Sequence, residues 1–226
     1  MKRIFSMVNH KGGVGKTTCA VNIAYQLSQL NHKVLLIDAD PQWNATAGLG
    51  IEPDQVSGTL YNLFSDDPKD MDVSIQDIIL PTKYNNLNLI PATIGMAIID
   101  RIGFTGSELV IKNAINTVAN DYDYTIIDTP PSLGILTTAS MVASTHLLVP
   151  IQCEFYAVMG MAELIQTYRL VKRKLNPDIV VGGAIITMYD KRNNLSIETV
   201  NTVRNFFKEK TYNTLIPRTV RVSEAQ

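Results

Sequence analysis

The sequence predicts an α/β protein whose mostly parallel, twisted sheet is covered by helices on both faces. Short apolar, β-branched runs alternate with longer amphipathic segments along the 226 residues, as expected when helices connect parallel strands. A glycine-rich loop joins the first run directly to a helical pattern. Several runs end in polar residues, and ligands of open α/β sheets bind beyond the carboxyl ends of strands. We therefore look for chemistry at those ends.

The predicted elements follow one another with no internal repeat. Strands are expected at Ile4–Val8, Val34–Ile37, Leu87–Ile90, Tyr124–Ile127, His146–Ile151, Val180–Thr187 and Thr214–Ile216. Helices are expected at Thr17–Leu30, Leu109–Asn120, Leu136–Ala143, Ala157–Leu175 and Ser196–Glu209. The acidic stretch from Glu52 to Thr82, with Asp66-Asp67-Pro68, is expected to form short helices and loops. We expect a single domain over residues 1–226.

Composition is that of a globular protein with a sizeable core, since 46% of the residues are hydrophobic and 18% are charged. No apolar run approaches the ~20 residues of a membrane span. Met1-Lys2-Arg3 leads into a strand rather than a signal peptide. Cys19 and Cys153 fit neither a disulfide framework nor a metal cluster. These features favour a cytoplasmic protein.

The loop between the first strand and the first helix has the sequence VNHKGGVGKTT, from Val8 to Thr18. Glycines at 12, 13 and 15 permit backbone conformations that let consecutive N–H groups point at phosphate oxygens. The helix that follows adds its positive N-terminal end. Lys16 is expected to reach the outer phosphates and the Thr17 hydroxyl to hold Mg²⁺. The segment therefore predicts a nucleoside triphosphate site rather than a simple glycine-rich turn.

One departure from the usual pattern G-x-x-x-x-G-K-S/T stands at the front of this loop. His10 occupies the place of the first glycine, and an additional lysine, Lys11, follows it.

Two carboxylates follow the second strand, in the segment LLIDADPQ. Asp38 and Asp40 have the spacing i, i+2, which places them on one side of an extended strand near the bound Mg²⁺ and terminal phosphate. We expect Asp40 to orient or activate water, and Asp38 to support the loop or the hydration shell of the metal. The alternative is a strand-to-loop cap, for which aspartate followed by proline is common.

The fourth strand ends in Asp128, in the segment YTIIDTPPSLG. Four aromatic or β-branched residues closing on one aspartate are typical of the second motif of nucleoside triphosphatases, whose carboxylate contacts Mg²⁺ directly or through water. The turn from Pro130 to Gly134 is then expected to act as a switch. The alternative is a rigid connection.

The charge distribution is uneven although the net charge is −1. Residues 1–167 contain nine Lys and Arg against sixteen Asp and Glu, whereas residues 168–221 contain eleven against four. The C-terminal part is therefore a basic region.

Several segments together resemble the ParA/Soj partition ATPases, a deviant Walker A family of P-loop NTPases related to MinD. The segments are KGGVGKTT from Lys11, DADPQWNAT from Asp38, IIDTPPSLG from Ile126, PIQCEFYAVMGMAEL from Pro150, ITMYDKRNNLS from Ile186 and IPRTVRVSEA from Ile216. They occur in collinear order over nearly the whole chain. The resemblance implies an ATPase that uses ATP/ADP and Mg²⁺.

The resemblance also implies catalytic roles for Lys11, Lys16 and Asp40. Lys11 matches the signature lysine, which crosses to the nucleotide of the partner subunit when two monomers enclose two ATP molecules. Asp40 matches the hydrolytic aspartate; the implied Mg²⁺ set is Thr17, Asp40 and Asp128, partly through water. The implied nucleotide-binding set is Lys11, Gly12, Gly13, Val14, Gly15, Lys16, Thr17 and Thr18, with Met188, Pro217 and Arg218 on the adenine side.

The family further implies a homodimer that binds double-stranded DNA without sequence preference and a ParB-like, centromere-binding partner. Arg192 and Arg221 match positions of DNA-contacting arginines, and Lys191, Lys172 and Arg173 extend the expected surface. The alternative for residues 172–174 is a solvated helix face. The location implied is cytoplasmic and nucleoid-associated.

Two departures from the family pattern stand out. Trp43 occupies a place where the family usually has glycine. The family continues beyond SEA into a final helix, whereas this chain stops at Gln226, so we expect that helix to be missing.

Other functions with the same loop were weighed. A MinD-like ATPase needs a C-terminal amphipathic helix for the membrane, and nothing after Arg221 has that pattern, so no membrane partner is expected. Nitrogenase iron proteins need cluster cysteines, which Cys19 and Cys153 do not match. Amidotransferase-type synthetases need a substrate domain, for which little room is left. A ParA-like positioning ATPase for a non-DNA cargo remains the main alternative.

Overall fold

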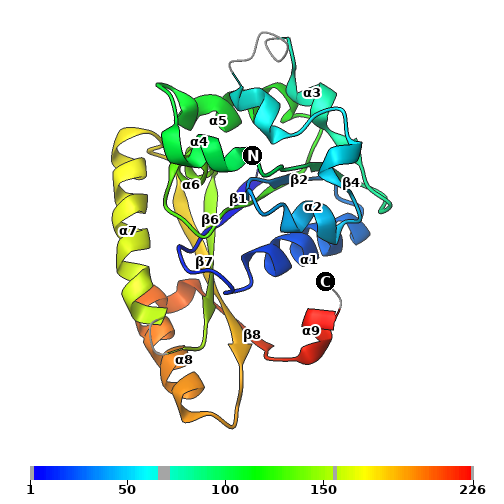
Figure 1. The fold of residues 1–226 in the computed structure, drawn as a ribbon. Coiled ribbons are helices and arrows are strands. Elements are labelled where there is room, and N and C mark those ends of the chain that lie inside the picture. Colours follow the sequence, from blue (N-terminus) through cyan, green and yellow to red (C-terminus); the bar gives the residue numbers. More distant parts are fainter. Residues whose placement is uncertain (1–2, 66–71, 155–156, 225–226) are drawn as a thin grey trace.

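A computed structural model describes residues 3–65, 72–154 and 157–224 of the chain. Within these ranges one eight-stranded sheet runs in the order β3-β4-β2-β5-β1-β6-β7-β8, and only the pairing of β3 with β4 is antiparallel. Helices lie on both faces of the twisted sheet (Figure 1). The predicted fold class is therefore confirmed.

The strands are short and mostly buried, as expected for a parallel sheet covered on both faces. Their bounds are β1 Arg3–Met7, β2 Val34–Asp38, β3 Leu80–Pro81, β4 Leu87–Ile90, β5 Tyr124–Asp128, β6 His146–Gln152, β7 Val180–Tyr189 and β8 Thr211–Pro217.

The longer helices are the amphipathic segments that the sequence predicts, with ends shifted by one or two residues. The α-helices are α1 Lys16–Gln29, α2 Asn44–Gly48, α3 Ile75–Ile78, α4 Met96–Ile102, α5 Val110–Val118, α6 Ile135–Ala143, α7 Ala157–Lys174, α8 Asn194–Phe207 and α9 Val220–Glu224. None of those within the described ranges has the length and apolarity needed to cross a membrane.

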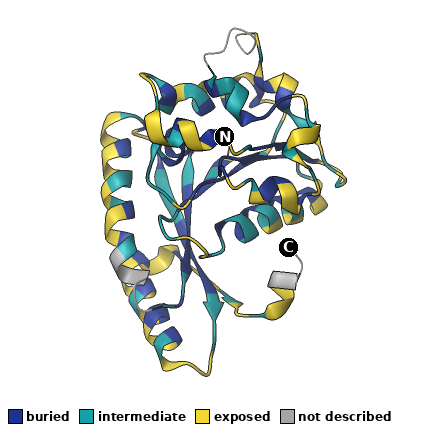
Figure 2. Ribbon diagram, viewed as in Figure 1, coloured by how far each residue is buried: buried dark blue, intermediate teal, exposed yellow. Residues whose placement is uncertain are grey.

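The two faces of the sheet bury different side chains because successive residues of a strand point to opposite sides. On β2, Leu35 and Ile37 pack into the cluster formed with α4, α5 and α6, whereas Val34 and Leu36 pack into the cluster formed with α1. α7 and α8 extend the first layer beside β6 and β7. Figure 2 shows the buried strands between helices whose exposed residues face outward.

The short elements were not predicted. β3 has two residues and pairs antiparallel with β4 at the sheet edge, while α2, α4 and α9 have five, seven and five residues. Such segments are too short to show a helical or strand period. The acidic stretch does form short helices, including 3₁₀ turns at Pro53–Gln55 and Leu60–Phe64, although Asp66-Asp67-Pro68 lies outside the described residues.

Asn176 ties the end of α7 to the end of α6. Its buried side-chain amide reaches the carbonyl oxygens of Met141 at 3.1 Å, Val142 at 3.1 Å and Ser144 at 2.7 Å. The last carbonyl groups of a helix have no partner within the helix. A single side chain from another element therefore supplies what the α6 backbone lacks.

Replacing this amide tests its contribution. We expect Asn176→Ala to lower the free energy of unfolding by about 1–3 kcal/mol, because buried carbonyl groups lose their donor. Chemical denaturation measures the change. Asn201→Ala, at an exposed position of α8, is the control and should change stability by less than about 0.5 kcal/mol. Equal effects of the two substitutions would contradict this account.

Candidate functional site

The glycine-rich loop connects β1 to α1. Gly13 has φ +71° and Gly15 has φ +88°, both in the left-handed region that favours glycine. Gly15 is the N-cap of α1, and its carbonyl accepts the amide of Cys19 at 2.9 Å. Gly12 differs from the expectation: it needs no left-handed backbone, and a Cβ there would make an ordinary 3.7 Å contact with Pro131. Two of the three glycines therefore set the loop conformation.

Hydrogen bonds to neighbouring strands β6 and β7 fix this loop. Asn9 donates to the carbonyl of Pro150 at 2.8 Å and accepts the amide of Lys11 at 3.0 Å. Thr187, near the end of β7, donates to the carbonyl of Val14 at 2.8 Å. Neither Asn9 nor Thr187 is among the site residues predicted from the sequence. The polar end of the β7 apolar run was the available signal, since it matches the polar ends of β2 and β5.

Lys16 is almost fully buried at the start of α1. Its ammonium group lies 3.5 Å from the carbonyl oxygen of Lys11, so the side chain curls back over the loop. Burial lowers the pKa of Lys16, while the charges of Asp128 and Asp40 oppose that effect. The structure thus brings this cation together with two of the three carboxylates that the sequence singled out.

Asp128 ends β5 and is fully buried. The strand register places it beside Met7 of β1 on one side and Asp38 of β2 on the other. Neither carboxylate oxygen has a hydrogen-bond partner within the described residues. Burial, and next the charge of Asp38, raise the pKa of Asp128 well above its usual value; the Thr17 hydroxyl and Lys16 lower it without completing a hydrogen bond.

Asp38 supports the loop after β2. Its carboxylate accepts the amide and the hydroxyl of Thr46, both at 2.8 Å, and the amide of Asp40 at 3.1 Å. Burial raises its pKa and these hydrogen bonds partly offset that effect, so that the pKa is about 6. Asp38 therefore fixes the path of residues 39–46, as one of its expected roles required.

Asp40 lies beyond the end of β2 rather than within an extended strand, so the i, i+2 argument does not describe its geometry. Its Oδ1 accepts the amide of Gln42 at 3.0 Å, the cap that the alternative interpretation predicted. Burial raises its pKa, while that hydrogen bond and Lys16 lower it. Asp40 therefore caps the loop after β2 and also lies close enough to Lys16 for their charges to interact.

Trp43 follows in a left-handed conformation with φ +45°. Its amide donates to the carbonyl of Asp40 at 2.8 Å and its own carbonyl accepts the amide of Ala47 at 3.0 Å. A residue with a Cβ is strained in this region. The backbone thus explains why glycine suits this position better.

The oxygen atoms at this edge suit Mg²⁺. The ion prefers hard oxygen ligands, keeps several waters and binds through one or two carboxylates together with phosphate oxygens. The unpartnered Asp128 carboxylate, the nearby Thr17 hydroxyl and Asp40 provide such a set. No group of three His, Cys, Asp or Glu side chains in the described ranges could hold an ion alone. Phosphate oxygens would have to complete the shell.

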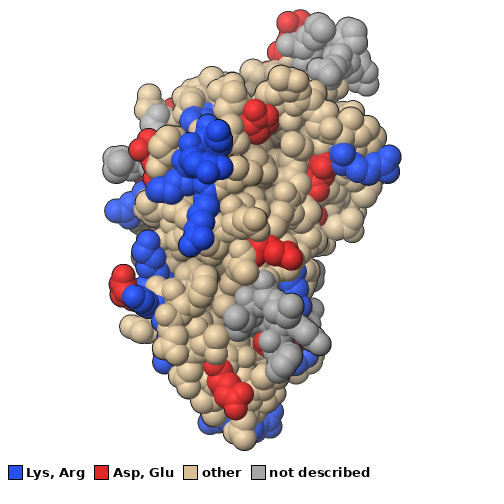
Figure 3. Space-filling view, turned by 90° about the vertical axis from the view of Figure 1, so that its left-hand side faces the viewer, with Lys and Arg blue, Asp and Glu red and all other residues tan. Residues whose placement is uncertain are grey.

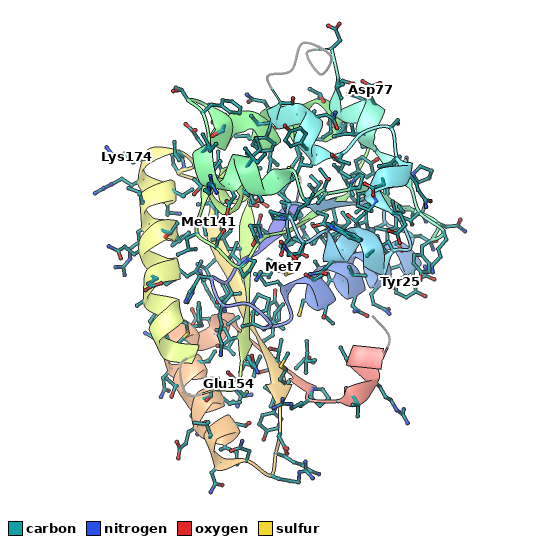
Figure 4. All side chains as sticks on the ribbon, in the orientation of Figure 1. Met7, Tyr25, Asp77, Met141, Glu154 and Lys174 are labelled. Carbon is teal, nitrogen blue, oxygen red and sulfur yellow. The ribbon has the colours of Figure 1, made fainter. Side chains whose placement is uncertain are left out.

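Lys11 points away from its own loop. Its ammonium group pairs with the carboxylate of Glu154, in the segment between β6 and α7, and that carboxylate also accepts the side-chain amide of Gln152. Figure 4 shows Glu154 at the opposite end of α7 from Lys174. The sequence analysis did not single out Glu154.

The residues expected on the adenine side come together at the ends of β7 and β8. Pro217 pairs with Tyr189 in the register of the two strands, and the amide of Arg218 donates to the carbonyl of Tyr189 at 3.0 Å. Met188 lies between Tyr189 and the loop-bonding Thr187, with φ +53°. This group is therefore adjacent to the phosphate loop.

The predicted basic surface consists of two separate clusters. Lys172 and Arg173 lie in the last turn of α7, and Lys172 donates to the carbonyl of Ile179 at 2.7 Å, just before β7 begins. Lys191 and Arg192 follow the other end of β7. Ten extended residues span roughly 30 Å, so the two clusters do not form one patch. Figure 3 shows Lys and Arg gathered over the α7 face.

The second cluster is partly neutralised. The Arg192 guanidinium donates to both carboxylate oxygens of Asp190, at 3.0 and 2.9 Å, and these hydrogen bonds lower the pKa of Asp190 to about 2. Lys191 and Arg221 are exposed. These two cations are more available to an external phosphate than Arg192, whose guanidinium binds Asp190.

Known proteins are similar in sequence to this chain over nearly its full length. A family model described as an AAA domain matches residues 2–181. The sporulation initiation inhibitor protein Soj of Bacillus subtilis is 44% identical, over 100% of this chain and 88% of that protein. The chromosome partitioning protein ParA of Myxococcus xanthus is 42% identical, over 98% of this chain and 77% of that protein.

A solved structure supports the same fold and cofactors. Cobyrinic acid a,c-diamide synthase from Mycobacterium smegmatis, with a bound ATP analogue and magnesium, has a TM-score of 0.88 and 32% identity, over 97% of this chain and 88% of that chain. In this chain the phosphate loop and the buried carboxylates lie at the carboxyl ends of β1, β2 and β5. The chain is an ATPase that uses ATP or ADP with Mg²⁺, and it belongs to the ParA/Soj family of partition ATPases.

Proposed function

We propose that this ATPase segregates DNA. As a Mg-ATP homodimer it binds double-stranded DNA without sequence preference, associates with the nucleoid, and hydrolyses ATP when a ParB-like partner stimulates it. One observation carries the proposal: Lys16, Asp40 and Asp128 lie buried together behind the phosphate loop, in a chain whose relatives are named for partitioning. A non-DNA cargo is the alternative outcome of the tests below.

The site residues take the following roles in this proposal. Backbone N–H groups from Gly12 to Thr18 and the start of α1 bind the phosphates, and Lys16 neutralises the outer ones. Thr17 and Asp128 hold Mg²⁺, with Asp40 acting through water. The metal supplies charge neutralisation on the phosphate oxygens. Asp40 accepts a hydrogen bond from the attacking water and orients it, and Met188, Pro217 and Arg218 border the adenine.

Lys11 changes its partner during the cycle. In the monomer it pairs with Glu154, so a lysine that crosses to another subunit's nucleotide must first leave that carboxylate. In the dimer, the ammonium group of Lys11 would stabilise the negative charge that develops on the transferred phosphoryl group. In this proposal the pair with Glu154 holds Lys11 within its own chain until the ATP dimer forms.

The metal role of Asp128 predicts a conflict between stability and function. We expect Asp128→Asn to raise the melting temperature of nucleotide-free protein by about 2–4 °C, or about 1 kcal/mol, because it removes a buried carboxylate without partners. The additional stabilisation that Mg²⁺ gives over ATP alone should shrink. Calorimetry with ATP plus Mg²⁺ or EDTA measures both effects.

The pH dependence of the same protein has a defined sign. Folded-state pKa values of Asp38 and Asp128 are raised, so wild-type stability should fall as pH rises from the unfolded value of about 4 towards and beyond the folded value of about 6 for Asp38. Asp128→Asn should flatten this decline. Asp178→Asn, at an exposed position, is the control. An unchanged pH profile in Asp128→Asn would contradict a raised folded-state pKa of Asp128.

Asp40 is tested by separating binding from turnover. Asp40→Ala should bind ATP and form the ATP dimer as wild type does, but hydrolyse ATP about 100-fold more slowly, the usual contribution of a group that activates water. Equilibrium binding and single-turnover assays give the two quantities. Asp54→Ala, an exposed substitution in the 3₁₀ turn at Pro53–Gln55, is the control. Normal turnover in Asp40→Ala would remove Asp40 from this role.

DNA binding is tested by retention on nonspecific duplex DNA. Retention should require ATP and weaken steeply with salt. Arg221→Ala should weaken binding for all sequences and lower the salt slope by about 1. Arg173→Ala, in the distant α7 cluster, should have a smaller effect. If the ATP dimer shows no retention at low salt, the DNA part of the proposal is lost and a non-DNA cargo is favoured.

A further inference from the structure

Asp100, in α4, binds the turn that follows Asp128. Its Oδ2 accepts the hydroxyl of Ser132 at 2.8 Å and its Oδ1 accepts the amide of Leu136 at 3.1 Å. Leu136 lies in the first turn of α6, where backbone N–H groups have no partner within the helix. One carboxylate thus joins α4 to both the turn and the helix after it.

Gly134 makes this contact possible. Its φ is −74°, so it has no conformational need for glycine. A Cβ at this position would lie 2.3 Å from Oδ1 of Asp100, with all three nearest atoms belonging to that carboxylate. The glycine therefore provides the space in which the Asp100 carboxylate rests against the turn.

The turn is held on its other side by its own helix. The Thr137 hydroxyl donates to the carbonyl of Ser132 at 2.8 Å. Asp100 and Thr137 together fix Ser132 through its hydroxyl and its carbonyl. The position of the segment between Asp128 and α6 therefore depends on a side chain that lies outside the segment.

Asp100 is also within electrostatic reach of the loop after β2. Burial is the main cause of the raised pKa of Asp40, and the negative charge of Asp100 adds to it. The inner face of α4 packs Met96 and Ile99 into the core, which limits movement of the helix that carries Asp100. The carboxylate is thus a fixed point near both loops that carry the proposed hydrolytic groups.

We propose that Asp100 is a positioning residue for ATP hydrolysis: it holds the Pro130–Gly134 turn so that the turn and Asp128 stay aligned with the terminal phosphate and the attacking water. This inference rests on the proposed roles of Asp40 and Asp128. A carboxylate that only capped α6 would support folding and leave turnover of the folded protein unchanged.

Two substitutions at Asp100 separate these roles. Asp100→Ala removes both hydrogen bonds and should lower single-turnover hydrolysis about tenfold, the scale of a misplaced reacting group, with ATP affinity within about twofold of wild type because Lys16 and the phosphate loop are untouched. Asp100→Asn can still accept from Leu136 and donate to Ser132. It should recover most of the rate.

Gly134→Ala reaches the same contact from the other side. Its methyl group displaces the carboxylate, so the rate should fall as in Asp100→Ala, and the double variant should be no slower than either single variant. Asp77→Asn is the matched control. Asp77 caps α3 through Ser74, away from the site (Figure 4), so this change should leave the rate unaltered.

The outcomes are distinct. Wild-type turnover in folded Asp100→Ala, equal loss in the Asn and Ala variants, or additive losses in the double variant would each overturn the inference. If wild type itself binds ATP but does not hydrolyse it, the proposed function fails instead. Should Asp100→Ala not fold, Gly134→Ala and Asp100→Asn, each compared with Asp77→Asn, still decide the matter.

Discussion

The burial of three carboxylates and one lysine at the carboxyl ends of the central strands is the constraint on which the rest of the structure depends. Parallel pairing of β2, β5 and β1 sets Asp38 beside Asp128 and Asp128 beside Met7, just before the loop begins. Like charges this deeply buried are unfavourable. Asp38 accepts hydrogen bonds from Thr46 and from the amide of Asp40, whereas neither oxygen of Asp128 has a hydrogen-bond partner in the part of the chain that the structure describes. Asp128 therefore lacks a compensating cation in the fold, and a Mg²⁺ ion beside it would supply one.

The loop conformation comes from its surroundings as much as from its glycines. Gly13 and Gly15 permit the left-handed turns, but Asn9 and Thr187 fix the loop to β6 and β7. The same edge brings Met188, Pro217 and Arg218 beside the phosphate loop, because β7 and β8 run parallel to β1. Asp100, in α4, fixes the turn after Asp128. Polar side-chain contacts with neighbouring elements thus hold both the phosphate loop and the turn after Asp128.

The surface that meets a partner is less concentrated than the site. Lys172 donates a hydrogen bond to the carbonyl of Ile179, and Arg192 is paired with Asp190. Lys11 is likewise engaged, by Glu154. Exposed cations remain near both ends of β7, with Arg173 and Lys174 at the end of α7 and Lys191 after the other end of the strand.

The sequence by itself determined the fold class and the five long helices, and it predicted the phosphate loop with Lys16, Asp40 and Asp128, because hydrophobic period, turn chemistry and strand-end residues are local properties of the chain. The elements α2, α4 and β3 were missed since short segments carry no period. Only the tertiary structure decided that Gly12 needs no special backbone, that the basic residues form two clusters, and that Asn9, Thr187, Glu154 and Asp100 contact the phosphate loop or the turn after Asp128. Those contacts join residues distant in sequence, and the register of a parallel sheet, which no local pattern encodes, brings them together.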